Sequence, residues 1–414
     1  MHRFLTYLFI AMLAASPAIF MRLHGTSAGP LVQAGVFGGA ILAAGFMLSW
    51  GAEAAESRVS QGLMLAGLAL VTVLPEYAID IYYAFRAGQA PDSNYVHYAA
   101  ANMTGANRLL VGAAWPMVVF LHWRRTRERA IELKPSNLVE LFFLLLASLY
   151  AFVILIKDRI DLVDFAILLA IFGAYIWCVS RSLRGGETHV DEDEDDDDDA
   201  EPGPAAVLET LTPRAQWAWT AGLTLVAGAI ILLSAEPFAN AMIGSGRALG
   251  VDEFLLIQWI APLTGESPEI LLAVLFVYAA RPGSALIALV SDKINQWTLL
   301  VGALPVAMSI GAGSLIALPL SERQHEEFFL TAAQSLFGIS LLLGLRLRLV
   351  GAFALAVLFG GQLVLAFSLQ HNPAAEIAAL TGLGWVYLVL AAIVVAAQWR
   401  AIAAMFKAPS RVAD

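Results

Sequence analysis

Two stretches place a glutamate directly after a proline inside a long apolar run: Thr72-Val73-Leu74-Pro75-Glu76 and Gly265-Glu266-Ser267-Pro268-Glu269. Such runs, each long enough at about 20 residues to cross the hydrocarbon core of a bilayer, recur along almost the whole chain. The composition agrees, because 59% of the 414 residues are hydrophobic and only 14% are charged. A soluble globular domain has nearly twice that share of charged residues. The chain is therefore predicted to be an integral membrane protein.

The apolar runs are predicted to be helices, because lipid offers no partner for backbone polar groups. The short alternating segments of a β-barrel are not seen in the sequence. We predict an all-α polytopic membrane protein with about twelve spans, near residues 4–21, 30–50, 60–86, 95–121, 136–156, 162–181, 215–236, 252–280, 284–313, 326–345, 349–369 and 375–398. The first span could be a cleaved signal peptide, but its length favours an uncleaved helix.

The two halves of the chain repeat the same landmarks in the same order. Gly51-Ala52-Glu53 matches Ser234-Ala235-Glu236, Pro75-Glu76 matches Pro268-Glu269, and Asn102 and Asp292 each stand ten residues before the glycine of a Leu-Leu-Val-Gly sequence. Five predicted spans separate the copies, and an odd number inverts one copy relative to the other. Inverted repeats with polar residues inside their spans are typical of secondary transporters, whose site lies near the bilayer midplane.

The paired glutamates indicate a cation site. A carboxylate at the bilayer centre costs roughly 2.5 to 3.5 kcal/mol on insertion scales, so it needs a reason to be there. The preceding proline is expected to open the helix and free carbonyls near Val71–Thr72 and Thr264–Gly265. Carboxylate, carbonyl and hydroxyl oxygens together suit Na⁺ or Ca²⁺. A single buried glutamate could equally have a packing role, but the matched positions of Glu76 and Glu269 favour a site.

Four further residues are candidates for the same site. Asp80 lies one helical turn after Glu76, and Glu266 one turn before Glu269. Each could be a ligand, a proton carrier or a group nearer the membrane surface. Because two close carboxylates rarely both stay charged, one of each pair could hold a proton. Asn102 and Asp292 would add oxygen ligands, although Asn102 alone could be a helix–helix hydrogen bond.

Two basic residues stand close to these candidates in the sequence. Arg108 is expected to extend to the membrane interface, where its charged end is hydrated. Lys293 either does the same or neutralises a surplus carboxylate. The lone cysteine, Cys178, lies in an apolar run and is expected to be a small buried hydrophobic residue.

The only long polar segment, residues 182–214, separates the halves and is predicted to be a disordered linker. It contains nine consecutive acidic residues, Asp191 to Asp199, which account for most of the net charge of −10. A solvated spacer is favoured over a Ca²⁺ sensor, because EF-hand spacing is missing. Basic clusters beginning at Arg124, Arg346 and Arg400 all fall on one side, which places that side, both termini and the linker in the cytoplasm.

These motifs resemble the α-repeats of the calcium/cation antiporter superfamily, which includes the sodium/calcium exchangers. The first repeat of that superfamily is similar to Gly-Thr-Ser-Leu-Pro-Glu followed by Gly-Asn-x-x-Gly-Ser-Asn. Here Val71–Glu76 keeps the threonine, leucine, proline and glutamate, and Ala101–Asn107 keeps both asparagines and the second glycine. The second repeat departs further, since Gly265-Glu266 replaces the hydroxyl residues and Asn295-Gln296-Trp297 replaces Gly-Ser-Asn.

The resemblance implies that Glu76 and Glu269 are the shared Ca²⁺/Na⁺ ligands, with Thr72, Asn102 and Asp292 beside them. It also implies a ten-helix core that works by alternating access. The expected organisation is an extra N-terminal helix (residues 1–29), a first exchanger repeat (30–181), the acidic linker (182–214), a second exchanger repeat (215–369) and an extra C-terminal helix with its tail (370–414).

The expected function is secondary antiport of Na⁺ and Ca²⁺ in a prokaryotic plasma membrane. The alternative is exchange of Ca²⁺ or another cation for protons, which the extra carboxylates Asp80 and Glu266 and the missing hydroxyls favour. A cation channel would need several subunits around one pore, and a membrane enzyme would need a nucleophile or metal constellation that the sequence lacks. The expected partners are the lipid bilayer and the transported cations, with no cofactor, ATP or nucleic acid.

Overall fold

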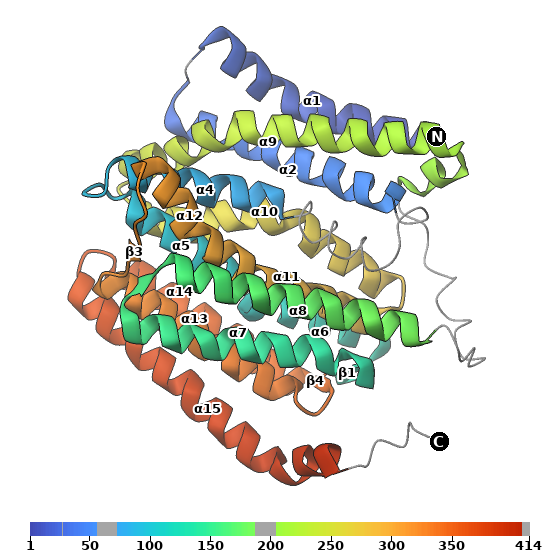
Figure 1. Cartoon of the computed structure of the whole chain (residues 1–414), viewed down its shortest axis with the longest axis vertical. Helices are drawn as coiled ribbons and strands as arrows, with labels where there is room; N and C mark the ends of the chain where they lie inside the picture. Colours follow the sequence, from blue (N-terminus) through green and yellow to red (C-terminus); the bar gives the residue numbers. More distant parts are fainter. Residues whose placement is uncertain (27, 56–72, 187–203, 408–414) are drawn as a thin grey trace.

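A computed structural model of the chain describes residues 1–26, 28–55, 73–186 and 204–407 (Figure 1). Helices make up nearly all of it. The first half contains α1 (His2–His24), α2 (Pro30–Ala55), α4 (Leu74–Gln89), α5 (Tyr95–Leu109), the π-helix η2 (Leu110–Ala114), α6 (Trp115–Thr126), α7 (Leu138–Lys157) and α8 (Leu162–Gly186). The second half contains α9 (Pro213–Leu249), α10 (Glu253–Tyr278), α11 (Pro282–Asn295), the π-helix η6 (Gln296–Leu300), α12 (Val301–Ala312), α13 (Glu322–Leu342), α14 (Leu349–Leu369) and α15 (Pro373–Lys407).

Within the described residues, ten helical segments are long and apolar enough to cross a membrane. They match ten of the twelve predicted spans and confirm an all-α membrane architecture. Of the predicted span 60–86, the structure describes only the part from residue 73 onward, which contains α4. The predicted span 326–345 is the helix α13, whose first turns carry four charged residues, Glu322, Arg323, Glu326 and Glu327. Helices α5, α7 and α15 surround α13, so it can be polar inside a membrane protein.

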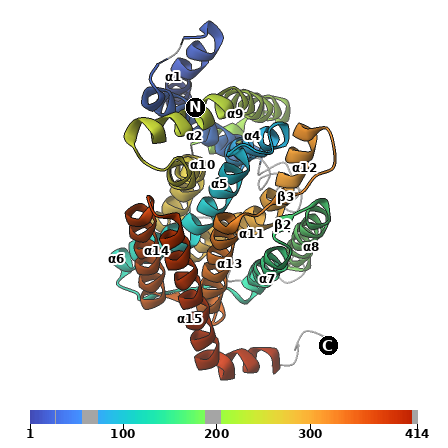
Figure 2. The ribbon, with the colours of Figure 1, turned by 90° about the vertical axis from the view of Figure 1, so that its left-hand side faces the viewer.

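The helices lie roughly side by side in three groups (Figures 1 and 2). The first group is α1, α2 and α9; the middle group is α4, α5, α10, α11 and α12; the third is α6, α7, α8, α13, α14 and α15. Helices α2 and α9, which begin the two predicted exchanger repeats, pack along each other. The candidate site residues are carried by the middle group, with helices on both sides.

Two short antiparallel strand pairs join the halves at opposite faces of the bundle. At one face, β1 (Ala130–Glu132) pairs with β4 (Arg346–Arg348). At the other face, β2 (Arg159–Ile160) pairs with β3 (Leu318–Pro319). Each pair links a loop of the first half to a loop of the second half, as expected for inverted repeats. The N-terminus and the end of α15 lie on the side of β1 and β4 (Figure 1).

The prediction that residues 182–214 are disordered throughout is wrong at both ends. Helix α8 continues to Gly186, and residues Ala206–Thr210 form a 3₁₀-helix, η5, with Leu208 buried. The backbone N–H groups of Ala205 and Ala206 donate to the carboxylate of Glu53 at 3.1 and 3.0 Å. This anchor on the end of α2 explains the order, because it supplies partners that the local composition lacks. The acidic run lies outside the described residues.

Candidate functional site

The two proline–glutamate motifs lie on α4 and α10 and meet at a glycine of α2. A Cβ atom added to Gly45 would lie 2.7 Å from Cγ of Pro268 and 3.7 Å from Cγ of Pro75. The first contact is closer than a side chain tolerates, so only glycine lets α2 approach both prolines. The packing of α2 therefore brings the matched motifs of the two halves together.

The sequence predicts that both prolines open their helices, but the structure does not show this at either proline. Helix α10 runs without a break through Pro268, so the expected opening near Thr264–Gly265 is wrong for the second repeat. The proline still withholds its N–H from the Thr264 carbonyl. Helix α4 begins at Leu74, with Pro75 in its first turn. A proline there removes no helical hydrogen bond, because the first N–H groups of a helix have no partner within it. Thr72, the predicted hydroxyl ligand, lies outside the described residues.

Gln296 joins Glu76 of the first half to Glu266 of the second. Its side-chain amide donates to Oε2 of Glu76 at 3.2 Å and also to Oε1 of Glu266. Both carboxyl groups are only 2% exposed and lie within hydrogen-bonding reach of each other. Sequence reasoning had treated Gln296 only as a departure from the family motif, and its role depends on a contact between residues that are 220 positions apart.

Asp80 and Asn102 form a second buried pair, between α4 and α5. The Asn102 amide donates to Oδ1 of Asp80 at 2.9 Å, and both residues are fully buried. The remaining oxygens, Oδ2 of Asp80 and Oδ1 of Asn102, have no hydrogen-bond partner among the described residues. The pair therefore presents two free acceptors from neighbouring helices.

Glu269 and Asp292 complete the predicted set on the side of the second repeat. Both carboxylate oxygens of Glu269 are buried, and no described residue hydrogen-bonds to them. Asp292 is partly buried on α11 and lies close enough to Glu76, Glu266 and Glu269 to interact electrostatically with each. The described candidates thus share one region of negative charge built from both halves.

The free polar atoms of this region are almost all oxygens, which suits a hard cation such as Ca²⁺. They are Oε1 of Glu76, Oδ2 of Asp80, Oδ1 of Asn102, both carboxylate oxygens of Glu269 and Oε1 of Gln296. However, no three Asp, Glu, His or Cys side chains of the described residues lie close enough together to hold a metal ion. The arrangement is a cluster of carboxyl groups rather than a closed coordination shell, and a cation would have to draw the carboxylates together.

The prediction that Arg108 reaches the membrane interface is wrong. Its side chain is fully buried and forms an ion pair with Glu327 of α13, to which Gln258 of α10 also donates at 2.6 Å. A carboxylate on a neighbouring helix removes the need to reach water. Lys293 is also fully buried and donates to the backbone and side-chain oxygens of Asn107 at 3.0 and 3.2 Å. Glu327 was missed, although a carboxylate at the start of a predicted span was a signal that could have found it.

Each half carries a π-helical turn just after its site residue. η2 (Leu110–Ala114) follows Asn102, and η6 (Gln296–Leu300) follows Asp292 and contains the shared donor Gln296. Single π-turns cluster at functional positions, because the extra residue rotates the side chains that come after it.

Residues 30–181 match the sequence model of a family described as "Sodium/calcium exchanger protein". Curated protein sequences include none that matches the chain significantly. Among solved structures, the chain is similar to the H⁺/Ca²⁺ exchanger CAX, with 37% identity over 97% of this chain and 96% of that one and a TM-score of 0.86.

Two more distant structures share the fold. Native YfkE is 13% identical, and the match covers 87% of this chain and 99% of that one with a TM-score of 0.60. The sodium-calcium exchanger NCX_Mj, soaked with Na⁺ and Sr²⁺, is 16% identical, and the match covers 82% of this chain and 99% of that one with a TM-score of 0.52.

Proposed function

The chain belongs to the calcium/cation antiporter superfamily, and from this premise we propose that it exchanges Ca²⁺ for protons by alternating access. We choose the proton as counter-ion because of the similarity to CAX, an H⁺/Ca²⁺ exchanger that matches the chain over almost its full length. This reverses the order of the two coupling ions expected from the sequence, where Na⁺ came first.

The charge of the candidate site supports protons as the counter-ion. Five carboxyl groups interact there, those of Glu76, Asp80, Glu266, Glu269 and Asp292, whereas one Ca²⁺ offsets only two negative charges. The buried cation nearby is Lys293, which interacts with Glu266. Since unpaired buried charges are costly, the surplus needs neutralising in at least part of the cycle, and protons on these carboxyl groups would do so.

The structure suggests how the exchange would proceed. Glu76 and Glu266, which share the amide of Gln296, would hold a proton between them when no cation is bound. Ca²⁺ would be bound as substrate by Glu76 and Glu269, with Asn102, Asp292 and Asp80 supplying further oxygens and Thr72 a hydroxyl. The positive charge would displace the proton, and the reverse order on the other side would complete the antiport. This mechanism uses neither ATP nor a resident cofactor.

The test uses purified protein in sealed liposomes, with radioactive Ca²⁺ outside and either Na⁺ or a proton gradient inside at matched membrane potential. We expect uptake that follows the pH gradient, is indifferent to Na⁺, and is lost in Glu76→Gln and Glu269→Gln. Glu236→Gln is the matched control, because that carboxylate is half exposed and pairs with Arg22 at 2.6 Å. Uptake driven by Na⁺ alone would replace this proposal with sodium/calcium exchange.

A further inference from the structure

Helix α13 carries three charged residues that lead from the surface into the helix bundle and do not belong to the candidate cation site. The side chain of Arg323 is 20% exposed, whereas Glu326 and Glu327 are 3% and 1% exposed. Charged groups this deep are rare unless they are paired or have a function.

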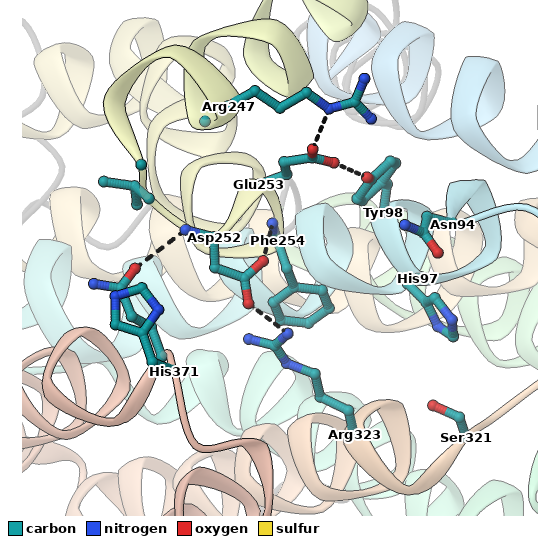
Figure 3. Close-up of a pocket in the computed structure, with 14 residues that line it drawn as sticks. Asn94, His97, Tyr98, Arg247, Asp252, Glu253, Phe254, Ser321, Arg323 and His371 are labelled. Carbon is teal, nitrogen blue, oxygen red and sulfur yellow. Dashed lines mark hydrogen bonds and ion pairs between the residues drawn. The ribbon is translucent and has the colours of Figure 1, made fainter.

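The outer end of this series lies in a cavity of about 650 Å³ at the face that bears β2 and β3. We call this cavity the vestibule; Asp252, Tyr98, His97 and His371 are among the residues that line it (Figure 3). Arg323 donates to Asp252 at 2.7 Å and to Glu376 of α15 at 3.1 Å. Both carboxylates therefore share one cationic partner, Arg323, which lines the vestibule.

The inner end of the series is also paired. Glu327 accepts hydrogen bonds from Arg108 of α5 and Gln258 of α10, and the guanidinium of Arg108 lies 5.0 Å from the ring centre of Trp259. These bonds tie α13 to two helices that carry candidate ligands, since Asn102 is on α5 and Glu266 is on α10.

Glu326 is the charged residue of this series that has no hydrogen-bond or ion-pair partner among the described residues. Both of its oxygens are buried, and no residue in the described part of the chain hydrogen-bonds to either. The charged groups that act on it are Glu327 and Arg323 of its own helix, Arg108 of α5 and Glu376 of α15. On α7, which also packs on α13, Lys157 is paired with Asp164. With Arg108 and Arg323 already bonded to other carboxylates, an ionised Glu326 would be a buried charge without a partner.

We propose that Glu326 is a proton-binding site that lies apart from the cation site and controls the rate of the transport cycle. The proton comes from water in the vestibule and returns there. While Glu326 is neutral, Arg108 bonds to Glu327, and α5, α10 and α13 are held together as observed. When the proton leaves, the new negative charge competes for Arg108, whose Nη1 is unpartnered among the described residues. The three helices are then released to move.

The test measures Ca²⁺/Ca²⁺ self-exchange in liposomes with equal pH on both sides, so no proton gradient drives it. Protons that compete with Ca²⁺ at the cation site raise the KM, and saturating Ca²⁺ overcomes them. A proton on Glu326 lowers the maximal rate instead. We expect the maximal rate of the wild type to fall about fivefold or more as the pH is lowered. Glu326→Gln should show the low rate at every pH with unchanged Ca²⁺ binding.

Glu322→Gln, one turn earlier on α13 and exposed, is the matched control and should keep the wild-type pH profile. Glu326→Leu is the second variant, because an apolar side chain is readily buried there and also cannot bind a proton. The proposal is overturned if the maximal rate of the wild type does not change with pH. It is also overturned if the maximal rate of either Glu326 variant depends on pH. Since self-exchange proceeds whether Na⁺ or H⁺ is the counter-ion, this result is independent of the liposome gradient experiment.

Discussion

At the scale of single residues, the buried carboxylates differ in the hydrogen-bond or ion-pair partner that compensates their charge. Glu327 has the guanidinium of Arg108, Asp80 has the amide of Asn102, and Glu76 shares the amide of Gln296 with Glu266. The guanidinium of Arg108 brings a full positive charge to Glu327, whereas a neutral amide brings none and leaves room for a cation or a proton to compensate the carboxylate. The first arrangement suits a structural bond, and the second suits a site that is filled and emptied.

This distinction predicts the effect of breaking the Arg108–Glu327 pair. Arg108→Met leaves a carboxylate buried without its cation, so the free energy of unfolding should fall by about 3–5 kcal/mol. The double variant Arg108→Met with Glu327→Leu should recover most of this loss, because both charges are removed. Denaturant unfolding in detergent, followed by tryptophan fluorescence, measures both. A double variant no more stable than the single one would contradict the explanation.

The candidate residues that could be predicted from the sequence are those that stand in a local motif rarely found inside an apolar span. A proline–glutamate pair in a 20-residue apolar run is improbable without a function, and its repetition at Glu76 and Glu269 was visible without a structure. The donors Gln296 and Arg108 could not be assigned to their partners. Their partners, Glu76 and Glu327, lie 220 and 219 positions away, and only the packing of the helices decides such pairs.

At the scale of elements, the site depends on how closely α5 and α10 approach. A Cβ atom at Gly105 of α5 would lie 1.8 Å from the backbone oxygen of Gln258 on α10. Since backbone cannot move aside as a flexible side chain does, the two helices would have to separate.

We therefore expect Gly105→Ala to lower the melting temperature and abolish Ca²⁺ uptake. Separation of α5 from α10 would shift Asn102 relative to Glu266 and weaken the bond between Gln258 and Glu327. Gly173→Ala on α8 is the matched control, since a Cβ atom there would meet nothing within 4 Å. Thermal unfolding followed by size-exclusion chromatography, together with liposome uptake, compares the two. Wild-type uptake by Gly105→Ala would show that this close approach is dispensable.

The end of the linker gives a second prediction at this scale. Glu53 accepts the N–H groups of Ala205 and Ala206, and hydrogen bonds to a charged group contribute about 1.5–3 kcal/mol. Glu53→Ala should therefore speed hydrogen–deuterium exchange at residues 205–211. Glu236→Ala removes the corresponding carboxylate of the second half and should leave that exchange unchanged. Equal exchange in both variants would mean that other contacts hold η5 in place.

Element boundaries were predicted less well than element existence. Helix α9 was expected to end near residue 236 but continues to Leu249, because Pro237 is accommodated and the extension packs on neighbouring helices. Helix α13 was expected to begin near residue 326 but starts at Glu322, where Ser321 and Gln324 form a capping box. Hydropathy marks where a helix is apolar, and helices extend past that point when caps and contacts support them.

At the scale of the whole molecule, the positions of the two strand pairs agree with an inverted relation between the two repeats. By the order of the helices, the loop that carries β1 corresponds to the loop that carries β3, and the loop of β2 to the loop of β4. The pairs β1–β4 and β2–β3 therefore each join two non-corresponding loops, one pair at each of two opposite faces (Figures 1 and 2). The halves are therefore held together at both ends, while the candidate site lies between them. Alternating access requires such a frame, because part of the molecule must stay fixed while other helices move.

The orientation of this frame follows from charge. Arg124, Arg127, Arg129, Arg346 and Arg348 are exposed at the face that bears β1 and β4. An excess of arginine and lysine in short loops marks the cytoplasmic side. We therefore propose that this face and both termini are cytoplasmic and that the vestibule opens to the outside of a prokaryotic plasma membrane.

Single-cysteine labelling tests this orientation, after Cys178, the only cysteine in the sequence, is replaced by serine. His371→Cys lies in the exposed turn between α14 and α15 beside the vestibule, and Arg129→Cys lies in the exposed loop before β1. A membrane-impermeant maleimide should label His371→Cys on intact cells and Arg129→Cys only after permeabilisation. The opposite pattern would turn the vestibule toward the cytoplasm, so that Glu326 would sense internal rather than external protons.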